Sequence, residues 1–153
     1  MGKVTTLFYR GKLVESIHNI KCYIGSVGGE KIFTTNNDND FIYPRSSIKI
    51  FQGIPFSNSQ AIDFYKLNNK QIALSCSSHN AESFHIKELK SWLNKTNLTK
   101  FHLQCGIHNP LDKKSAEKLF LSGKKPYQIH NNCAGKHLAM LSSCLVNKLP
   151  MKN

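Results

Sequence analysis

The sequence predicts an α+β protein with a β-hairpin region first and helices after it. Residues 4–35 contain apolar and β-branched runs of strand length, whereas apolar residues at helical spacing begin after Pro44. Strands and helices segregated in this way along a chain are typical of α+β folds rather than α/β folds. The chain has 153 residues, of which 40% are hydrophobic, so we expect a single domain over residues 1–153.

The first part of the chain contains a hairpin signal. Residues 21–27 and 30–35 are two strand-like runs, and Gly28 and Gly29 between them suit a two-residue turn. Residues 4–9 are expected to add a third strand. Residues 36–40 are polar and turn-forming, and we expect them to end the β region.

The first helix is predicted to begin near Pro44. A proline ahead of Ser46 suits a helix start, and three apolar residues follow at positions 48, 50 and 51. Gly53 and Pro55 are both unfavourable inside a helix, because glycine is flexible and proline lacks a backbone N–H. This helix is therefore expected to be short and to end at these two residues.

Five further helices are predicted downstream, over residues 59–67, 70–76, 81–95, 115–123 and 134–148. The helix over 81–95 has the clearest amphipathic pattern. Its apolar residues group on one side and are Phe84, Leu89, Trp92 and Leu93. No repeat or low-complexity segment divides the chain.

Charge and cysteine content limit the class of function. The formal net charge is +12, but the basic residues are mostly lysines scattered singly. A nucleic-acid-binding surface would be denser and richer in arginine, so no nucleic-acid partner is expected. The five cysteines are an odd number without paired spacing, which favours free thiols. No apolar run resembles a signal or membrane segment, so we expect a cytoplasmic protein without a membrane partner.

A serine lies three residues before a lysine in the segment 44–49 (PRSSIK). On a helix this spacing places the Lys49 amine beside the Ser46 hydroxyl, and a neutral amine can activate a serine as a nucleophile. Arg45 is a possible source of the positive charge that keeps such a lysine neutral. The alternative is an N-capping serine followed by a solvated lysine.

A second hydroxyl cluster lies at residues 76–79 (CSSH), directly after an apolar run. Ser78 is there a candidate for a second catalytic hydroxyl. A helix cap around Ser78 explains the same pattern equally well.

Two cysteine–histidine pairs have zinc-ligand spacing. Cys105 and His108 are separated by two residues, and so are His130 and Cys133. Four such ligands can close a structural zinc site. The alternative is a set of buried thiols and hydrogen-bonded imidazoles. Cys133 also precedes the predicted helix start at Ala134, where the helix dipole favours a thiolate.

Five stretches together resemble the bacterial asparaginase II family, the thermolabile, inducible type. They occur in family order over nearly the whole chain, as residues 10–18 (RGKLVESIH), 44–49 (PRSSIK), 73–79 (ALSCSSH, with Glu82 and His85), 105–112 (CGIHNPLD) and 130–137 (HNNCAGKH). This resemblance implies a fold like that of serine β-lactamases and glutaminases. It also implies hydrolysis of L-asparagine to L-aspartate and ammonia.

The resemblance implies a role for each matching residue. Ser46 matches the nucleophile, Lys49 its base and Ser78 a second catalytic serine. Arg45 and His137 match residues of the substrate site. Cys133 and Lys136 match two zinc ligands. The residues that match supports of the pocket are Cys105, His108 and His130. Zinc is then expected to help bind the substrate rather than to generate the attacking hydroxide.

The resemblance also implies a longer protein, because family members are about twice this length. A third zinc ligand and the lysine partner of Ser78 are expected from the later half. We therefore expect an incomplete domain, truncated on its C-terminal side: a fragment, a split gene product or a degraded gene. Such a chain is expected to leave apolar surface uncovered on the β region and on the helix after Ala134, and to lack activity alone.

The expected partners are L-asparagine and either a second copy, as in a full-length homodimer, or a complementing C-terminal half. Two other functions stay open. One is a small zinc-binding module without catalysis. The other is a penicillin-recognising acyl-serine protein, although the further motifs of that group are absent from the sequence.

Overall fold

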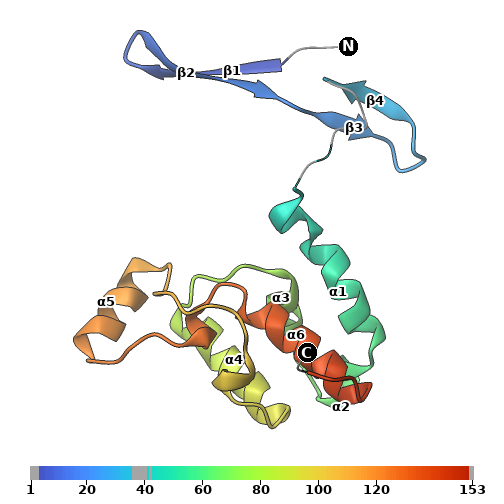
Figure 1. Ribbon diagram of the computed structural model, residues 1–153, viewed down its shortest axis with the longest axis vertical. Coiled ribbons are helices and arrows are strands. Elements are labelled where there is room, and N and C mark those ends of the chain that lie inside the picture. Colours follow the sequence, from blue (N-terminus) through green and yellow to red (C-terminus); the bar gives the residue numbers. More distant parts are fainter. Residues whose placement is uncertain (1–3, 36–40, 42, 152–153) are drawn as a thin grey trace. The chain divides into compact units, whose positions relative to one another are not determined.

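The structure is a computed structural model that describes residues 4–35, 41 and 43–151 (Figure 1). The chain divides into two compact units, Met1–Tyr43 and Pro44–Asn153. The first contains strands and the second contains helices, so the predicted α+β class is confirmed. No described helix has the length and apolar character needed to cross a membrane.

The first unit begins with a hairpin of β1 (Val4–Arg10) and β2 (Leu13–Ile20). The strands pair antiparallel, and Gly11 in the turn between them has a φ of +61°, which favours glycine. The predicted strand over 4–9 is thus confirmed, whereas β2 was not predicted. The pairing register shifts between Phe8 and Tyr9, and this irregularity interrupts the regular alternation of side chains between the two faces from which a hairpin is predicted.

A second hairpin joins β3 (Tyr23–Gly25) to β4 (Lys31–Thr34), as the glycine pair predicts. Its connection is longer than two residues, because the backbone of Ser26 pairs with both Gly29 and Glu30. The turn predicted for residues 36–40 lies outside the described residues. The apolar side chains of the four strands are largely exposed, as predicted for the β region.

The helical unit opens with a 3-10 turn, η1 (Arg45–Ile48), that leads into α1 (Lys49–Asn58). The prediction that Gly53 and Pro55 end this helix is wrong. Pro55 removes one helical hydrogen bond at a cost of about 3 kcal/mol. Burial of Phe56, which is 3% exposed, offsets roughly 1.5–3 kcal/mol of that cost. Phe56 is one of the core residues through which α1 packs against the rest of the unit, and the helix continues past Pro55.

Three helices follow as predicted, with different ends: α2 (Ala61–Phe64), α3 (Asn69–Cys76) and α4 (Ser83–Lys95). Asn68 begins α3 with a capping box, in which its side chain accepts from the Gln71 N–H. Leu89, Trp92 and Leu93 are buried, but Phe84 is 55% exposed. Phe84 lies in the first turn of α4, and its predicted place on the buried side is wrong.

The chain then passes through η2 (Lys100–His102), α5 (Lys113–Leu121) and η3 (Gln128–His130) to α6 (Ala134–Val146). Asp112, rather than Ser115, caps α5 by accepting the Ser115 N–H at 2.8 Å. The apolar residues of α6 are mostly covered by the core, so the expectation of an uncovered α6 is wrong.

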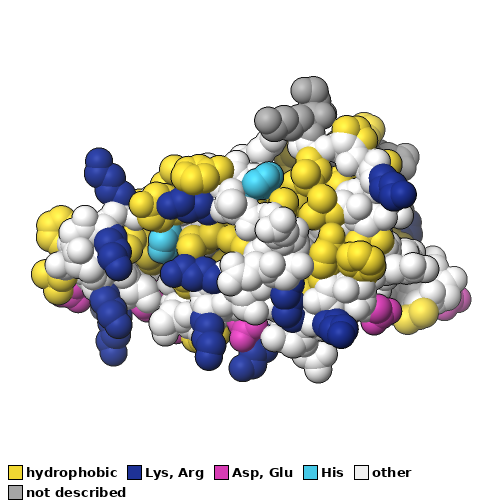
Figure 2. Space-filling view, turned by 90° about the horizontal axis from the view of Figure 1, so that it is seen from below, with side chains coloured by type: hydrophobic (Ala, Val, Ile, Leu, Met, Phe, Trp, Pro, Cys, Tyr) yellow, Lys and Arg dark blue, Asp and Glu magenta, His cyan; other side chains and the backbone are white. Residues whose placement is uncertain are grey.

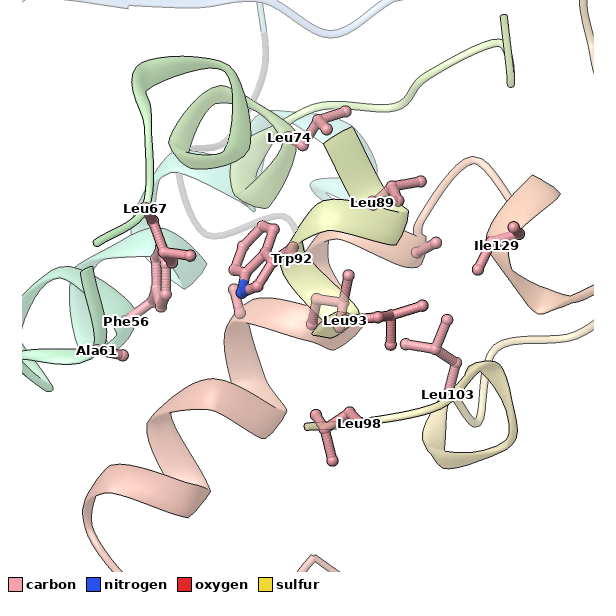
Figure 3. Packing of buried hydrophobic residues seen from close by; sticks show 13 residues of the cluster. Phe56, Ala61, Leu67, Leu74, Leu89, Trp92, Leu93, Leu98, Leu103 and Ile129 are labelled. Carbon is pink, nitrogen blue, oxygen red and sulfur yellow. The ribbon is translucent and has the colours of Figure 1, made fainter. Parts of the chain in front are cut away.

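The core of the helical unit lies around Trp92, where residues from α1, α3, α4 and α6 meet (Figure 3). The Trp92 indole N–H donates to Ser142 Oγ at 3.0 Å, which satisfies its one polar atom. Gly135 allows α6 to approach α3 closely, because a Cβ there would lie 2.2 Å from the Leu74 carbonyl oxygen. This contact fixes the beginning of α6 beside the end of α3.

Candidate active site

Lys49 and Ser78 meet in the helical unit. The Lys49 Nζ donates a hydrogen bond to Ser78 Oγ at 2.6 Å. Lys49 lies one turn before Gly53 on α1, and a Cβ on Gly53 would lie only 2.5 Å from Cys76 Sγ at the end of α3. Glycine at position 53 therefore lets the two helices approach each other. That approach places the lysine amine over the residues that follow α3.

Ser46 lies in η1, three residues before Lys49, and its side chain is exposed. The Lys49 backbone N–H donates to the Ser46 carbonyl oxygen. Within the part of the chain that the structure describes, the lysine amine bonds to the hydroxyl of Ser78 and not to that of Ser46. The hydrogen bond of the Lys49 amine thus goes to the serine that is more distant in sequence.

Arg45 stands at the start of this segment and is also exposed. Its φ of +45° lies in the left-handed region, which costs a non-glycine residue about 1–2 kcal/mol. Left-handed backbone held in place by its surroundings is common at functional sites. The predicted substrate-binding role of Arg45 stays a prediction.

The turn that carries Ser78 is held by backbone hydrogen bonds. The His79 N–H donates to the Asn132 carbonyl at 3.2 Å, and the Ala81 N–H donates to His79 Nδ1 at 3.1 Å. Ala81 is buried and has a φ of +61°, a conformation that again costs about 1–2 kcal/mol. Because these bonds fix the turn, the Ser78 hydroxyl has a defined position next to Lys49.

His79 itself is only 2% exposed. Burial lowers the pKa of its imidazole to about 4, and the nearby His85, His108 and Lys136 add to this effect. The imidazole is therefore neutral at neutral pH. With Nδ1 accepting from Ala81, the proton lies on Nε2, which is buried and has no hydrogen-bond partner among the described residues.

The beginning of α6 lies beside the turn that carries Ser78. Cys133 is the N-cap residue and is half-buried, and its N–H donates to Asn131 Oδ1 at 2.8 Å. Lys136 lies one turn further, and its amine reaches the Ser77 carbonyl at 3.5 Å. The two predicted zinc ligands thus share one helical turn beside the Ser78 turn.

His137 is half-buried next to Lys136. Burial lowers the pKa of its imidazole, and the Lys136 charge lowers it further. A neutral imidazole one turn into α6 is compatible with the predicted substrate-binding role, which stays a prediction.

The other predicted ligand residues make hydrogen bonds instead. His108 Nε2 accepts the Asn132 N–H at 3.1 Å, and His130 Nδ1 accepts the Tyr127 N–H at 2.9 Å. Cys105 Sγ donates to the Gln128 carbonyl at 3.6 Å, and burial raises the pKa of this thiol. Among the described residues, no three His, Cys, Asp or Glu side chains are placed to hold a metal ion.

A hollow of the described surface lies away from Ser46, Lys49 and Ser78. It has a volume of about 760 Å³ between α4 and α5, and none of its lining residues belongs to the serine–lysine cluster. Lysines line its rim, including Lys87, Lys90 and Lys118. On the face shown in Figure 2, lysine and arginine side chains stand among hydrophobic ones, and acidic side chains are few. This hollow is therefore separate from Ser46, Lys49 and Ser78, none of which lines it.

The sequence singles out Lys49 and Ser78 as candidates but does not predict that they pair with each other. Lys49 and Ser78 are 29 positions apart, and the backbone bond from His79 to Asn132 spans more than 50 positions. Asn132 was missed altogether. Its only sequence signal is its place between Asn131 and Cys133, in a motif first considered for metal binding.

A comparison with protein-family models matches residues 7–153 to the family described as L-asparaginase II. No curated protein matches the chain. The matched range includes every predicted site residue and nearly all of both units. The chain therefore belongs to the L-asparaginase II family.

Proposed function

We propose that this chain supplies the nucleophile, its base and a second hydroxyl of an amidohydrolase that converts L-asparagine to L-aspartate and ammonia. The observation that carries the proposal is the 2.6 Å contact between Lys49 Nζ and Ser78 Oγ, one turn from an exposed Ser46, in an L-asparaginase II chain. A serine hydroxyl within hydrogen-bond reach of an amine base is the arrangement that activates a serine as a nucleophile.

In the proposed reaction the Ser46 hydroxyl attacks the side-chain amide carbon of asparagine. Lys49, acting as a neutral amine, accepts the serine proton and returns it to the leaving nitrogen. Ammonia departs and leaves an aspartyl ester on Ser46. Water then attacks the ester, Lys49 again serves as base, and aspartate is released.

Ser78 has two possible parts in this scheme, and both follow from its bond to Lys49. As an intermediary, it relays protons between the lysine and the substrate. As a nucleophile, it exchanges roles with Ser46. We favour the first, because the Ser46 side chain is exposed and therefore accessible to a substrate.

A single amine cannot serve both serines at the same time. We therefore propose that a further base comes from a partner, either a complementing C-terminal half or a second copy of the chain. The exposed outer face of α1 fits such an association, because Ile50, Phe51 and Ile54 are 69%, 65% and 50% exposed beside the site.

Zinc has a weaker basis. Cys133 and Lys136 are suitably spaced on one turn, but zinc normally takes four ligands and a lysine binds it only when deprotonated. These two residues do not make a complete site, and no reaction step here depends on zinc. Metal analysis of the purified chain and of Cys133→Ser tests whether the pair binds zinc at all.

The proposed activity is tested by measuring ammonia release from L-asparagine. The chain is assayed alone and mixed with the C-terminal half of a full-length L-asparaginase II protein, with complex formation checked by gel filtration. We expect release from the complex and none from the chain alone.

Variants of the complexed chain identify the residues responsible. Ser46→Ala and Lys49→Met are each expected to abolish release. Ser47→Ala is the matched control, because Ser47 is an adjacent exposed serine whose hydroxyl bonds to the Pro44 carbonyl. A complex that forms but releases no ammonia contradicts the proposed function. Full activity in Ser46→Ala contradicts the role given to Ser46.

A further inference from the structure

The loop that contains Cys105 and His108 is joined to the loop that precedes α6. The Asn132 N–H donates to His108 Nε2 at 3.1 Å, and the Asn131 side-chain amide donates to the Gly106 carbonyl at 2.8 Å. The two cysteine–histidine motifs therefore contact each other through hydrogen bonds.

The same loop before α6 is joined to the turn that carries Ser78. Asn132 accepts the His79 N–H through its carbonyl, so its backbone is held from both sides, by His108 at nitrogen and by His79 at oxygen. The Asp112 N–H donates to the Asn80 carbonyl at 3.0 Å, which joins the Ser78 turn to the start of α5. We call His79, Asn132 and His108 the histidine bridge.

Both imidazoles of the histidine bridge have a fixed proton position. His108 Nδ1 lies 2.7 Å from the Asn109 carbonyl and carries the proton, which leaves the Nε2 lone pair free to accept from Asn132. His79 has the opposite tautomer, because its Nδ1 accepts from Ala81. The low pKa of His79 agrees with a neutral ring.

We propose that His79 and His108 are positioning residues, which hold the Ser78 turn and the start of α6 in one register so that the Ser78 hydroxyl meets the Lys49 amine. The left-handed, buried Ala81 directly after this turn is the kind of backbone that persists only where its surroundings hold it. The importance of Ser78 rests on the proposed function, but the bridge itself does not.

The histidine bridge also gives His108, in the Cys105–His108 motif, a structural role. A ring nitrogen that accepts a backbone N–H has no lone pair left for a metal. His108 therefore positions the loop before α6 and is not a zinc ligand, whether or not Cys133 and Lys136 bind zinc.

The test is nuclear magnetic resonance spectroscopy of the ¹⁵N-labelled chain, combined with two substitutions of His108. The ring spectrum of the unmodified chain is expected to show His108 protonated at Nδ1 and to stay unchanged when zinc chloride is added. Glutamine places an acceptor oxygen close to the position of Nε2, whereas leucine has similar bulk and no acceptor. His102→Leu, which removes an exposed histidine outside the bridge, is the matched control.

In His108→Leu, hydrogen exchange of the Asn132 amide is expected to accelerate about tenfold or more, because a partly buried donor loses its partner. The nuclear Overhauser contact between the side chains of Lys49 and Ser78 is expected to disappear. His108→Gln restores both, and His102→Leu changes neither.

Three results overturn the proposal: a His108 ring protonated at Nε2, a zinc-induced change in that ring, or a Gln variant that behaves as the Leu variant does. The ring spectrum of the unmodified chain decides the matter even if His108→Leu fails to fold. None of these readouts uses asparagine. The two proposals can therefore fail separately. If the histidine bridge is intact but Ser78→Ala retains full ammonia release, the role proposed for Ser78 is wrong and this inference still stands.

Discussion

Replacing His79 by asparagine tests whether the imidazole of this residue, which directly follows Ser78, is buried and neutral. The side-chain oxygen of the new amide can still accept the Ala81 N–H, but an amide does not titrate. In the native chain the pKa of His79 is lowered from 6.5 to about 4. At about 1.4 kcal/mol per pH unit, this difference makes the folded state about 3 kcal/mol less stable at low pH than at high pH.

The sign follows from where the proton binds. Between pH 6.5 and pH 4 the unfolded chain protonates His79 while the folded chain does not. The stability contributed by the neutral ring is therefore fully present above pH 6.5. It decreases as the pH falls, and it is lost below pH 4.

Urea denaturation at pH 8.0, 6.5, 5.0 and 4.0 measures this effect. The free energy of unfolding of the native chain is expected to fall across this range by about 3 kcal/mol more than that of His79→Asn. Other histidines with lowered pKa values, such as His130 and His137, contribute equally to both chains. His102→Asn, at an exposed histidine whose Nδ1 also accepts a backbone N–H, is expected to keep the native slope. Equal slopes for the native chain and His79→Asn would show that the His79 imidazole does not have a lowered pKa in the folded chain.

Three further predictions concern the framework of the site, and urea denaturation measures each. Gly53→Ala is expected to destabilise the chain by about 1–3 kcal/mol, because the new Cβ collides with Cys76 Sγ. Adding Cys76→Ala should recover most of this loss, whereas additive free-energy changes of the two substitutions would contradict the collision. Ser142→Ala should cost about 1–3 kcal/mol, since the buried Trp92 N–H loses its acceptor, and an unchanged midpoint would show that another acceptor replaces it. Asn68→Ala removes the α3 cap and is expected to cost about 1 kcal/mol, whereas no loss would mean that the cap is not formed.

Much of the fold follows from local patterns. The glycine pair predicts the second hairpin, and the apolar spacing around Trp92 predicts α4, because both signals depend on residues close together in sequence. Local rules fail at Pro55. There the helix continues because its next residue, Phe56, is buried in the core, and burial depends on helices that are distant in sequence.

The candidate site shows the same division. Ser46, Lys49 and Ser78 were found from short motifs, but their pairing was not. The Lys49 amine reaches Ser78 because Gly53 lets α1 approach Cys76, and no local pattern reports that approach. The spacing of the Cys105–His108 motif suggests zinc ligands and the family resemblance suggests residues that support the pocket, but neither predicts that the His108 imidazole accepts a backbone N–H from a loop 24 positions away.

Trapping the acyl-enzyme tests most directly whether this serine–lysine cluster performs amide hydrolysis. The chain, in complex with the C-terminal half of a full-length family member, is mixed with L-asparagine, quenched in acid within milliseconds to seconds, digested and examined by mass spectrometry. An aspartyl ester is expected on the peptide that contains Ser46, and it is expected to be absent from Ser46→Ala and Lys49→Met. An ester on Ser78 would exchange the roles of the two serines. Ammonia release without an ester on either serine would contradict the serine–lysine mechanism.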